Sequence, residues 1–434
     1  MKIKFQTPTG MHDILPDEQG YFRKIYNVCE NAANFYQFKK IDTPILEETE
    51  LFSKGTGMGS DIVQKQMYSL KTKGGDFLTL RPEFTPGIVR AYIKYGMRNL
   101  PQPVKLYSIG PVFRYERPQE DRYRQFHQFN LEILGEANPV IDAQIIQIFY
   151  NILEELKFKK LIVEINSIGD GICRPRYRKI LINYLKKRET DLCADCRQRL
   201  GKNPLRVLDC KEEKCWKIIK QAPQAINYLC NECREHFKEV LEFLDEIELP
   251  YNLNPYLVRG LDYYTKTVFE IFEEHGIAQE EKKRNALLAG GRYDNLVKKL
   301  GGLPTPACGG AIGIERIVNL IKTKEVKVSS LASTAQTKIF LAQLGDLAKR
   351  KSLNLLESFR KKKINIAESF SRDSLKSQLA QADKIGVKYT LILGQKEVLE
   401  NTIIIRDMKT GQQETKKMKE IVGIMKKKVE KIKT

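Results

Sequence analysis

The sequence predicts an α+β protein followed by a smaller α/β domain. Before about residue 325, strand-like runs are separated by turns and helices, and beyond residue 338 strands and helices alternate. The chain has 434 residues, of which 42% are hydrophobic and 29% are charged, so it suits two or three globular domains and excludes a wholly disordered chain or a fibre. No apolar run reaches the ~18 residues that a membrane span needs, and we therefore expect no membrane partner.

The first segment, residues 1–169, combines one helix with several strands. Apolar side chains at near-helical spacing predict an amphipathic helix over residues 18–36. Strand-like runs follow at residues 78–80, 104–107 and 126–134. Strands mixed with helices in this way favour a mostly antiparallel sheet.

The middle of the chain differs from the first segment in its predicted secondary structure and in its cysteine content. Residues 170–250 are helix-rich and carry most of the cysteines, and strand texture returns over residues 257–272. We therefore predict that residues 170–250 are inserted into one discontinuous domain, whose second part is residues 251–325.

The sequence predicts a separate domain at the end of the chain. Residues 326–337 are polar and suit a linker to residues 338–434. Within the latter range we expect strands at 339–341, 364–366 and 389–393 and helices at 344–361 and 375–385.

Charge is concentrated in that last domain. The chain carries a net +20, and residues 338–434 hold 23 basic and 11 acidic residues. A basic terminal module attracts polyanions such as nucleic acids. A generally lysine-rich composition is the alternative explanation.

Arginines gather around a predicted hairpin. Arg114 and Arg117 precede its polar loop, and Arg122 and Arg124 follow it. Arginines that share one face of a sheet match phosphate or carboxylate. A solvated hairpin with surface ion pairs would explain the same pattern.

The nine cysteines suggest metal ligands or reduced thiols. No secretory signal is visible, so we expect a cytoplasmic protein without disulfides. Two C-x₂-C pairs, Cys193 with Cys196 and Cys230 with Cys233, have the spacing of a tetrahedral zinc site. We predict one structural Zn²⁺ held by these four residues; four reduced thiols are the alternative. The cysteines without such a pattern are expected to be packing residues: Cys29, Cys173 and Cys308.

Several segments, in order along nearly the whole chain, resemble the histidyl-tRNA synthetases, a class II aminoacyl-tRNA synthetase family. Residues 10–16 (GMHDILP) and 259–264 (RGLDYY) resemble segments of the histidine enzymes. Residues 43–47 (TPILE) resemble class II motif 1. Residues 113–117 (FRYER) resemble the start of motif 2, which runs to Glu132, and residues 313–316 (GIER) resemble motif 3.

The resemblance implies a fold and a reaction. It implies a class II catalytic domain, with residues 170–250 as an insertion, followed by an anticodon-binding domain. The implied enzyme is a histidine–tRNA ligase that converts L-histidine and ATP, with Mg²⁺, into histidyl-adenylate and pyrophosphate. It then transfers histidine to the 3′ end of tRNA(His), and it is expected to be a homodimer through motif 1.

The resemblance also assigns ATP-binding residues. Arg114 and Arg259 are expected to bind the α-phosphate from opposite sides and to carry catalysis, Arg259 standing where related enzymes place a metal ion. Adenine is expected between Phe126 and Arg316. The remaining two assignments are Glu116 for adenine or ribose and Arg122 for the distal phosphates.

The implied histidine site divides into two ends. Glu83, Thr85 and Gln128 are expected at the ammonium group, and Glu132, Tyr263 and Tyr264 at the imidazole. The implied set also includes Phe84, Arg114 and Arg259.

Two other class II readings compete with this one. The first is a catalytically silent, histidine-sensing regulatory subunit of ATP phosphoribosyltransferase, which typically lacks the terminal domain and the ATP arginines. The second is a ligase for another amino acid, such as threonine or proline. Arg114, Arg259 and Arg316 argue against the regulator, and the RGLDYY segment argues against the other ligases.

Overall fold

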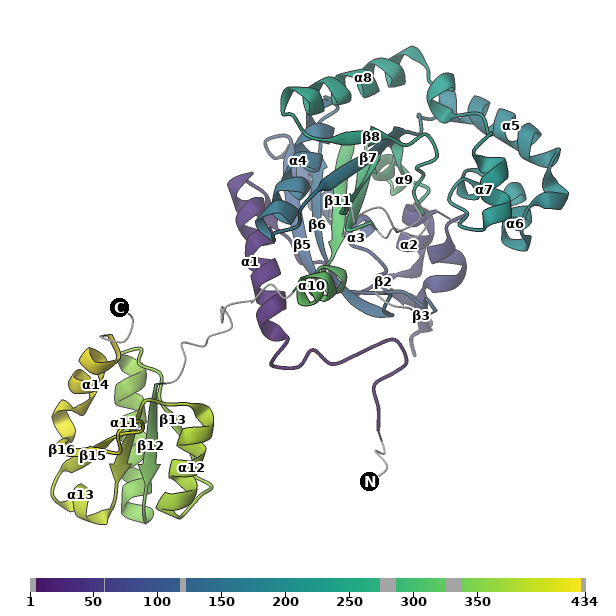
Figure 1. The fold of residues 1–434 in the computed structure, drawn as a ribbon. Coiled ribbons are helices and arrows are strands. Elements are labelled where there is room, and N and C mark those ends of the chain that lie inside the picture. The colour runs from purple at the N-terminus through teal and green to yellow at the C-terminus, as the bar shows by residue number, and fades with distance from the viewer. Residues whose placement is uncertain (1–4, 58, 118–121, 274–285, 325–337, 431–434) are drawn as a thin grey trace. The chain divides into compact units, whose positions relative to one another are not determined.

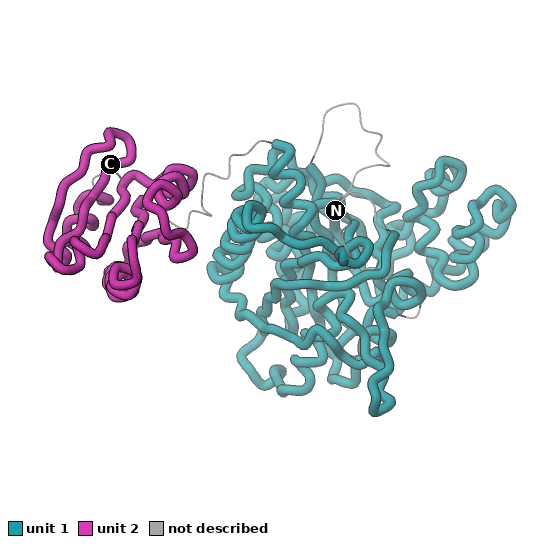
Figure 2. The backbone as a smooth tube through the Cα atoms, turned by 90° about the horizontal axis from the view of Figure 1, so that it is seen from below, with its two compact units in different colours: residues 1–328 teal, residues 329–434 magenta. Residues whose placement is uncertain are grey.

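The computed structural model describes residues 5–57, 59–117, 122–273, 286–324 and 338–430 (Figure 1). The chain divides into two compact units, residues 1–328 and 329–434 (Figure 2). The predicted linker, residues 326–337, lies outside the described residues. In the described ranges, every helix is too short or insufficiently apolar to cross a lipid bilayer.

A large sheet forms the centre of the first unit. Its strand order is β1-β5-β6-β11-β10-β9-β7-β8. Neighbouring strands are antiparallel except at its two edges, where β1 is parallel to β5 and β8 is parallel to β7. The bounds are β1 (Lys39–Lys40), β5 (Val104–Phe113), β6 (Gln125–Leu134), β7 (Leu161–Ser167), β8 (Tyr251–Leu253), β9 (Thr265–Glu273), β10 (Leu288–Arg292) and β11 (Ala307–Gly313). The predicted antiparallel sheet is confirmed, but residues 257–264 form a loop instead of the expected start of a strand.

Long helices cover one face of this sheet. Side chains of α1 (Gln19–Phe35), α4 (Val140–Glu155) and α10 (Ile314–Thr323) pack with those of β6, β7 and β9 in one apolar core. Figure 1 shows α1 and α4 beside the sheet, with α10 near its end. The predicted helix over residues 18–36 is α1, and Phe22, Ile25, Val28 and Cys29 are buried on its apolar face.

A second apolar core joins the insertion to helices of the first unit. It contains side chains of α3 (Thr85–Lys94), α9 (Leu296–Lys299) and the insertion. A small sheet, ordered β2-β4-β3, lies nearby in sequence: β2 (Leu46–Glu48), β3 (Tyr68–Lys71) and β4 (Phe77–Leu80). The remaining elements are α2 (Thr49–Thr56), η1 (Ile62–Gln66) and η2 (Met97–Asn99).

Residues 170–250 are helical, as the sequence predicts. The segment contains α5 (Cys173–Lys186), η3 (Glu189–Asp191), α6 (Ala194–Lys202), η4 (Pro204–Val207), α7 (Glu213–Ile219), η5 (Ala225–Tyr228) and α8 (Asn231–Glu246). A buried charge network joins α8 to the sheet. Asp142 Oδ2 accepts a hydrogen bond from Arg292 Nη2 at 2.8 Å and lies 2.9 Å from His236 Nε2.

The second unit is a five-stranded sheet with helices. The strand order is β13-β12-β14-β15-β16, in which β12 is parallel to β13 and β14 and the last two pairings are antiparallel. Its strands are β12 (Ile339–Gln343), β13 (Ala367–Glu368), β14 (Tyr389–Leu393), β15 (Thr402–Asp407) and β16 (Gln413–Lys417). Its helices are α11 (Asp346–Lys361), α12 (Leu375–Ile385), α13 (Gln395–Leu399), η7 (Met418–Glu420) and α14 (Ile421–Glu430). The expected strand at 364–366 was misplaced: residues 364–366 lead into the short β13.

Candidate functional site

One cavity of about 590 Å³ in the first unit collects side chains from distant parts of the sequence. It is lined by residues of β6, β11, the start of α10 and the loop that precedes β9. All but one of the sequence-predicted histidine and ATP residues line it: Glu83, Thr85, Arg114, Glu116, Arg122, Phe126, Gln128, Glu132, Arg259, Tyr263, Tyr264 and Arg316.

The exception is Phe84. Its ring is only 1% exposed and lies beneath the Arg81 guanidinium, 4.3 Å from the ring centroid, and it is not among the residues that line the cavity. Arg81 in turn donates to the carbonyl oxygens of Pro111 and Thr43 at 2.9 and 2.8 Å. The Phe84 side chain therefore supports the turn before α3, and the structure does not place it at the ligand.

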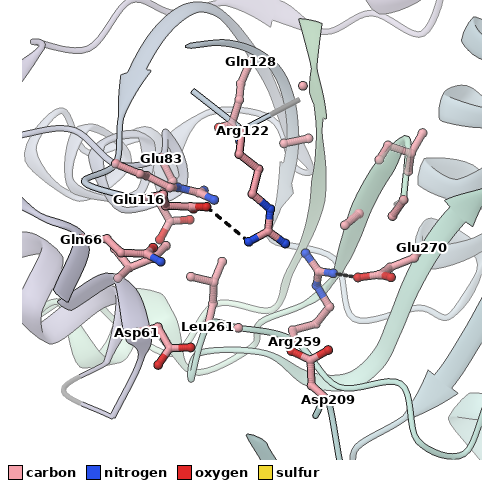
Figure 3. A pocket seen from close by; sticks show the side chains of 18 of the residues that line it. Asp61, Gln66, Glu83, Glu116, Arg122, Gln128, Asp209, Arg259, Leu261 and Glu270 are labelled. Atoms are coloured by element: carbon pink, nitrogen blue, oxygen red, sulfur yellow. Dashed lines mark hydrogen bonds and ion pairs between the residues drawn. The ribbon is translucent and has the colours of Figure 1, made fainter. Parts of the chain in front are cut away.

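Two arginines face each other across the cavity, and each has a carboxylate partner (Figure 3). Arg122 Nη1 lies 3.6 Å from Glu116 Oε2, and Arg259 donates from Nη1 to Glu270 Oε1. Burial alone would lower the pKa of Arg259, but the Glu270 carboxylate raises it on balance. The Arg259 guanidinium is thus a fixed positive charge at the cavity.

Arg114 is held in place by a backbone carbonyl and an aromatic ring. Its Nε donates to the Pro82 carbonyl oxygen at 2.9 Å, and its guanidinium lies 5.4 Å from the centre of the Phe126 ring. The backbone N–H of Arg114 donates to the Arg124 carbonyl oxygen at 2.9 Å, across the ends of β5 and β6. The hairpin therefore fixes the direction in which this arginine points.

Arg316, in the segment that resembles motif 3, lies in the first turn of α10. Its Nη1 donates to the carbonyl oxygen of Ala286. The neighbouring Glu315 is buried, and its carboxylate accepts hydrogen bonds from the backbone N–H of His127 at 2.8 and 2.9 Å. This contact joins the segment of β6 that carries Phe126 to the segment of α10 that carries Arg316, and both residues line the cavity.

Two buried carboxylates form the inner end of the cavity. Glu83 accepts from Thr56 Oγ1 and from the Tyr263 hydroxyl, each at 2.8 Å. Glu132 accepts from the hydroxyl groups of Thr85 and Tyr293. Each carboxylate offers about four lone-pair positions, so both keep acceptor capacity for a ligand.

Burial raises the pKa of both carboxyl groups. For Glu83, the hydrogen bond from Tyr263 opposes this effect. For Glu132, burial outweighs the hydrogen bonds from Thr85 and Tyr293 and raises the pKa to about 7. Such perturbed acids in a cleft are typical of functional sites.

A glycine makes room for Glu132. Gly309 pairs with it across β11 and β6, and a Cβ at Gly309 would lie 1.7 Å from Glu132 Oε2. A larger residue at position 309 would therefore displace the carboxylate. Sequence reasoning missed this role, as it missed Thr56, Glu270 and Tyr293; only the buried setting of these residues reveals them.

The predicted single metal site is wrong in its grouping. The structure divides its four cysteines between two clusters, Cys193 with Cys196 in one and Cys230 with Cys233 in the other. Cys173, expected to be a packing residue, belongs to the second cluster. By contrast, Cys29 and Cys308 are buried in the core, as expected.

Family comparisons agree with the site. A family model described as "Histidyl-tRNA synthetase" matches residues 10–317, well over half of the chain. The chain belongs to the histidyl-tRNA synthetase family. A second model, described as "Anticodon binding domain", matches residues 338–428.

Members of the histidyl-tRNA synthetase family resemble this chain over nearly its full length. A protein of Aquifex aeolicus named histidine–tRNA ligase is 44% identical over 420 residues, which are 96% of this chain and 100% of the relative. One of Dehalococcoides mccartyi with the same name is 41% identical over 98% of this chain and 100% of its own. A crystal structure of apo S. aureus histidyl-tRNA synthetase is 33% identical, with a TM-score of 0.76 over 97% of this chain and 99% of that one.

Proposed function

We propose that the protein is a histidine–tRNA ligase that works in the cytoplasm and uses ATP. The observation that carries this proposal is the convergence of Arg114, Arg122, Arg259 and Arg316 on one cavity beside buried carboxylates. Fixed guanidinium groups stabilise the negative charge that develops on a phosphate during transfer.

In the first step, a carboxylate oxygen of histidine attacks the α-phosphorus of ATP. The new P–O bond forms as the bond to the β-phosphate oxygen breaks, and pyrophosphate leaves with that electron pair. Arg114 and Arg259 bind the α-phosphate and the substrate carboxylate, and so align the two reacting groups.

The other parts of the nucleotide are bound by the remaining aromatic and charged residues of the site. Adenine stacks between Phe126 and Arg316, and Glu116 binds adenine or ribose. Arg122 binds the distal phosphates. Mg²⁺ would neutralise phosphate charge, and the carboxylates that line the cavity are oxygen ligands of the kind it prefers.

Histidine is recognised at the inner end of the cavity. Glu83, Thr85 and Gln128 bind the ammonium group, and Glu132 with Tyr263 and Tyr264 binds the imidazole nitrogens. An apolar competitor would leave these buried polar groups unpaired, and such a loss can give discrimination of ~10⁴-fold.

In the second step, the terminal ribose hydroxyl of tRNA(His) attacks the carbonyl carbon of the adenylate. The C–O bond to the phosphate breaks, AMP leaves with that electron pair, and the hydroxyl proton is released to water. The second unit, with its anticodon-binding match and strongly basic composition, supports tRNA binding.

A homodimer through the motif 1 region is part of the proposal. Large apolar side chains are exposed on the small sheet: Leu46 is 39% exposed, Leu70 is 43% and Phe77 is 61%. Such exposure favours an interface between two copies. Sedimentation should give a dimer that the double variant Leu46→Asp, Phe77→Asp converts to monomers; a monomeric unmodified protein would contradict this.

The deciding experiment is ATP–pyrophosphate exchange with each of the standard amino acids. We expect exchange with histidine alone, followed by charging of tRNA(His). Exchange with another amino acid would identify a different ligase. No exchange would favour the regulatory-subunit alternative, against which the converging arginines and the second unit both argue.

A further inference from the structure

All seven cysteines of the insertion fall into two clusters. The first contains Cys193, Cys196, Cys210 and Cys215; the second contains Asp170, Cys173, Cys230 and Cys233. Within each cluster the potential ligand atoms all lie within 4.8 Å of one another. Each cluster therefore offers four donors around one point.

The spacing in the first cluster matches a tetrahedral metal site. Cys193 Sγ lies 3.8 Å from Cys210 Sγ. A zinc ion with Zn–S bonds of ~2.3 Å places its sulfur ligands ~3.8 Å apart. A disulfide would need a separation of ~2.05 Å, and all nine cysteines are free.

The second cluster has the same dimensions with one oxygen donor. Cys173 Sγ lies 3.8 Å from Cys233 Sγ and 3.4 Å from Asp170 Oδ1. Zinc with one oxygen ligand at ~2.0 Å and sulfur at ~2.3 Å gives an O–S edge of ~3.5 Å. Asp170 thus completes a set of three sulfurs and one carboxylate.

Backbone groups support donors in both clusters. Cys193 and Cys230 stand at the N-cap positions of α6 and α8 with nearly the same backbone angles, φ −67° and ψ 163° for Cys193 and φ −67° and ψ 164° for Cys230. The Cys196 N–H donates to Cys193 Sγ at 3.4 Å, and the Cys173 N–H donates to Asp170 Oδ1 at 3.2 Å. Amide donors at helix starts stabilise thiolate and carboxylate ligands.

We propose that the insertion binds two structural zinc ions. The first is held by four thiolates, and the second by three thiolates and the Asp170 carboxylate. Soft thiolate ligands in a closed tetrahedral set select zinc over magnesium or calcium. This proposal is independent of the ligase activity, because it concerns only the donors in the insertion.

The first ion has a consequence for the cavity. Cys193 and Cys210 are among the residues that line it. Between them in sequence, Arg206 forms ion pairs with Asp61 at 2.8 Å and with Asp209 at 2.9 Å. Zinc at this cluster would therefore fix one wall of the cavity and the direction of Arg206.

The test is metal analysis of the full chain purified without chelators. We expect two zinc ions per chain. The pair Cys196→Ser, Cys215→Ser should lose one equivalent, and the pair Cys173→Ser, Cys233→Ser should lose the other. The control pair, Cys29→Ala with Cys308→Ala, should keep both.

X-ray absorption at the zinc edge of the unmodified protein keeps the test valid if a variant fails to fold. We expect about 3.5 sulfur ligands per zinc at ~2.3 Å, with the remainder oxygen. Three results would overturn the proposal: no zinc together with nine reactive thiols, disulfides within the clusters, or a single equivalent that either cysteine pair abolishes.

Discussion

The Glu315 carboxylate contacts His127 twice: the backbone N–H donates to its two oxygens at 2.8 and 2.9 Å, and Nδ1 lies 2.7 Å from Oε1. The two residues are 188 positions apart. Because His127 follows Phe126 and Glu315 precedes Arg316, this contact sets the distance between the two groups proposed to enclose adenine.

Loss of this contact should weaken ATP use. In Glu315→Ala, β6 and α10 lose a charge-assisted contact, and we expect kcat/KM for ATP in pyrophosphate exchange to fall roughly 10- to 100-fold. Glu239→Ala, at an exposed position of α8, should leave exchange unchanged. An unaltered kcat/KM in Glu315→Ala would show that the contact does not position the site.

Glu132 should make stability depend on pH. Its folded-state pKa is about 7 because of burial, above the ordinary value of 4.5 for a glutamate. Between these values the folded chain keeps a proton that the unfolded chain has lost, so stability falls as pH rises, by about 3 kcal/mol in total.

Urea unfolding from pH 5 to pH 8 measures this effect. The single tryptophan, Trp216, lies in the first unit and reports on its unfolding. We expect the stability of the unmodified protein relative to Glu132→Gln to decline over this range. A difference that does not change with pH would contradict the assigned pKa shift.

Asp142 should stabilise the contact between the insertion and the sheet. Its carboxylate is fully buried between Arg292 and His236, and its pKa is held low: burial alone would raise it, but the Arg292 guanidinium outweighs that effect. Asp142→Ala leaves the Arg292 charge buried without this partner, and we expect a loss of about 3–5 kcal/mol. Asp17→Ala, at an exposed position, is the control.

The same unfolding measurement checks this expectation. The contribution of Asp142 should be present at neutral pH and disappear as pH falls through its lowered pKa. Equal stability of the Asp142 and Asp17 variants at pH 7 would show that the network does not hold the insertion.

Arg259 should be needed for chemistry more than for nucleotide binding. Arg259→Ala removes the charge that we propose binds the α-phosphate, and we expect pyrophosphate exchange to fall by ~10³-fold or more. Binding of a fluorescent ATP analogue should change little, and the exposed control Arg197→Ala should retain exchange. Near-normal exchange by Arg259→Ala would overturn its role.

Much of the site could be predicted because its residues stand in recognisable segments. The arginines and the acids Glu83 and Glu132 were placed correctly in one cavity. Their partners could not be predicted, since an isolated Tyr293 or Glu270 in the sequence carries no sign of burial or of the strand opposite. Phe84 shows the reverse case, in which a residue assigned to the histidine site is buried in the core.

The cysteine clusters show a second limit of the sequence. Equal C-x₂-C spacing suggested that the two pairs share one ion, but spacing cannot tell which pairs meet after four helices have packed. Asp170, three residues before Cys173, repeats the same spacing with a carboxylate and was the available signal. The fold was easier to predict, because hydrophobic periodicity specifies elements such as α1 locally.

The most direct test of the proposed site is a crystal structure of the protein with histidine and a non-hydrolysable ATP analogue. We expect the α-phosphate between Arg114 and Arg259, with guanidinium nitrogens about 3 Å from its oxygens. A nucleotide bound outside the cavity, or an α-phosphate remote from both arginines, would contradict the proposal.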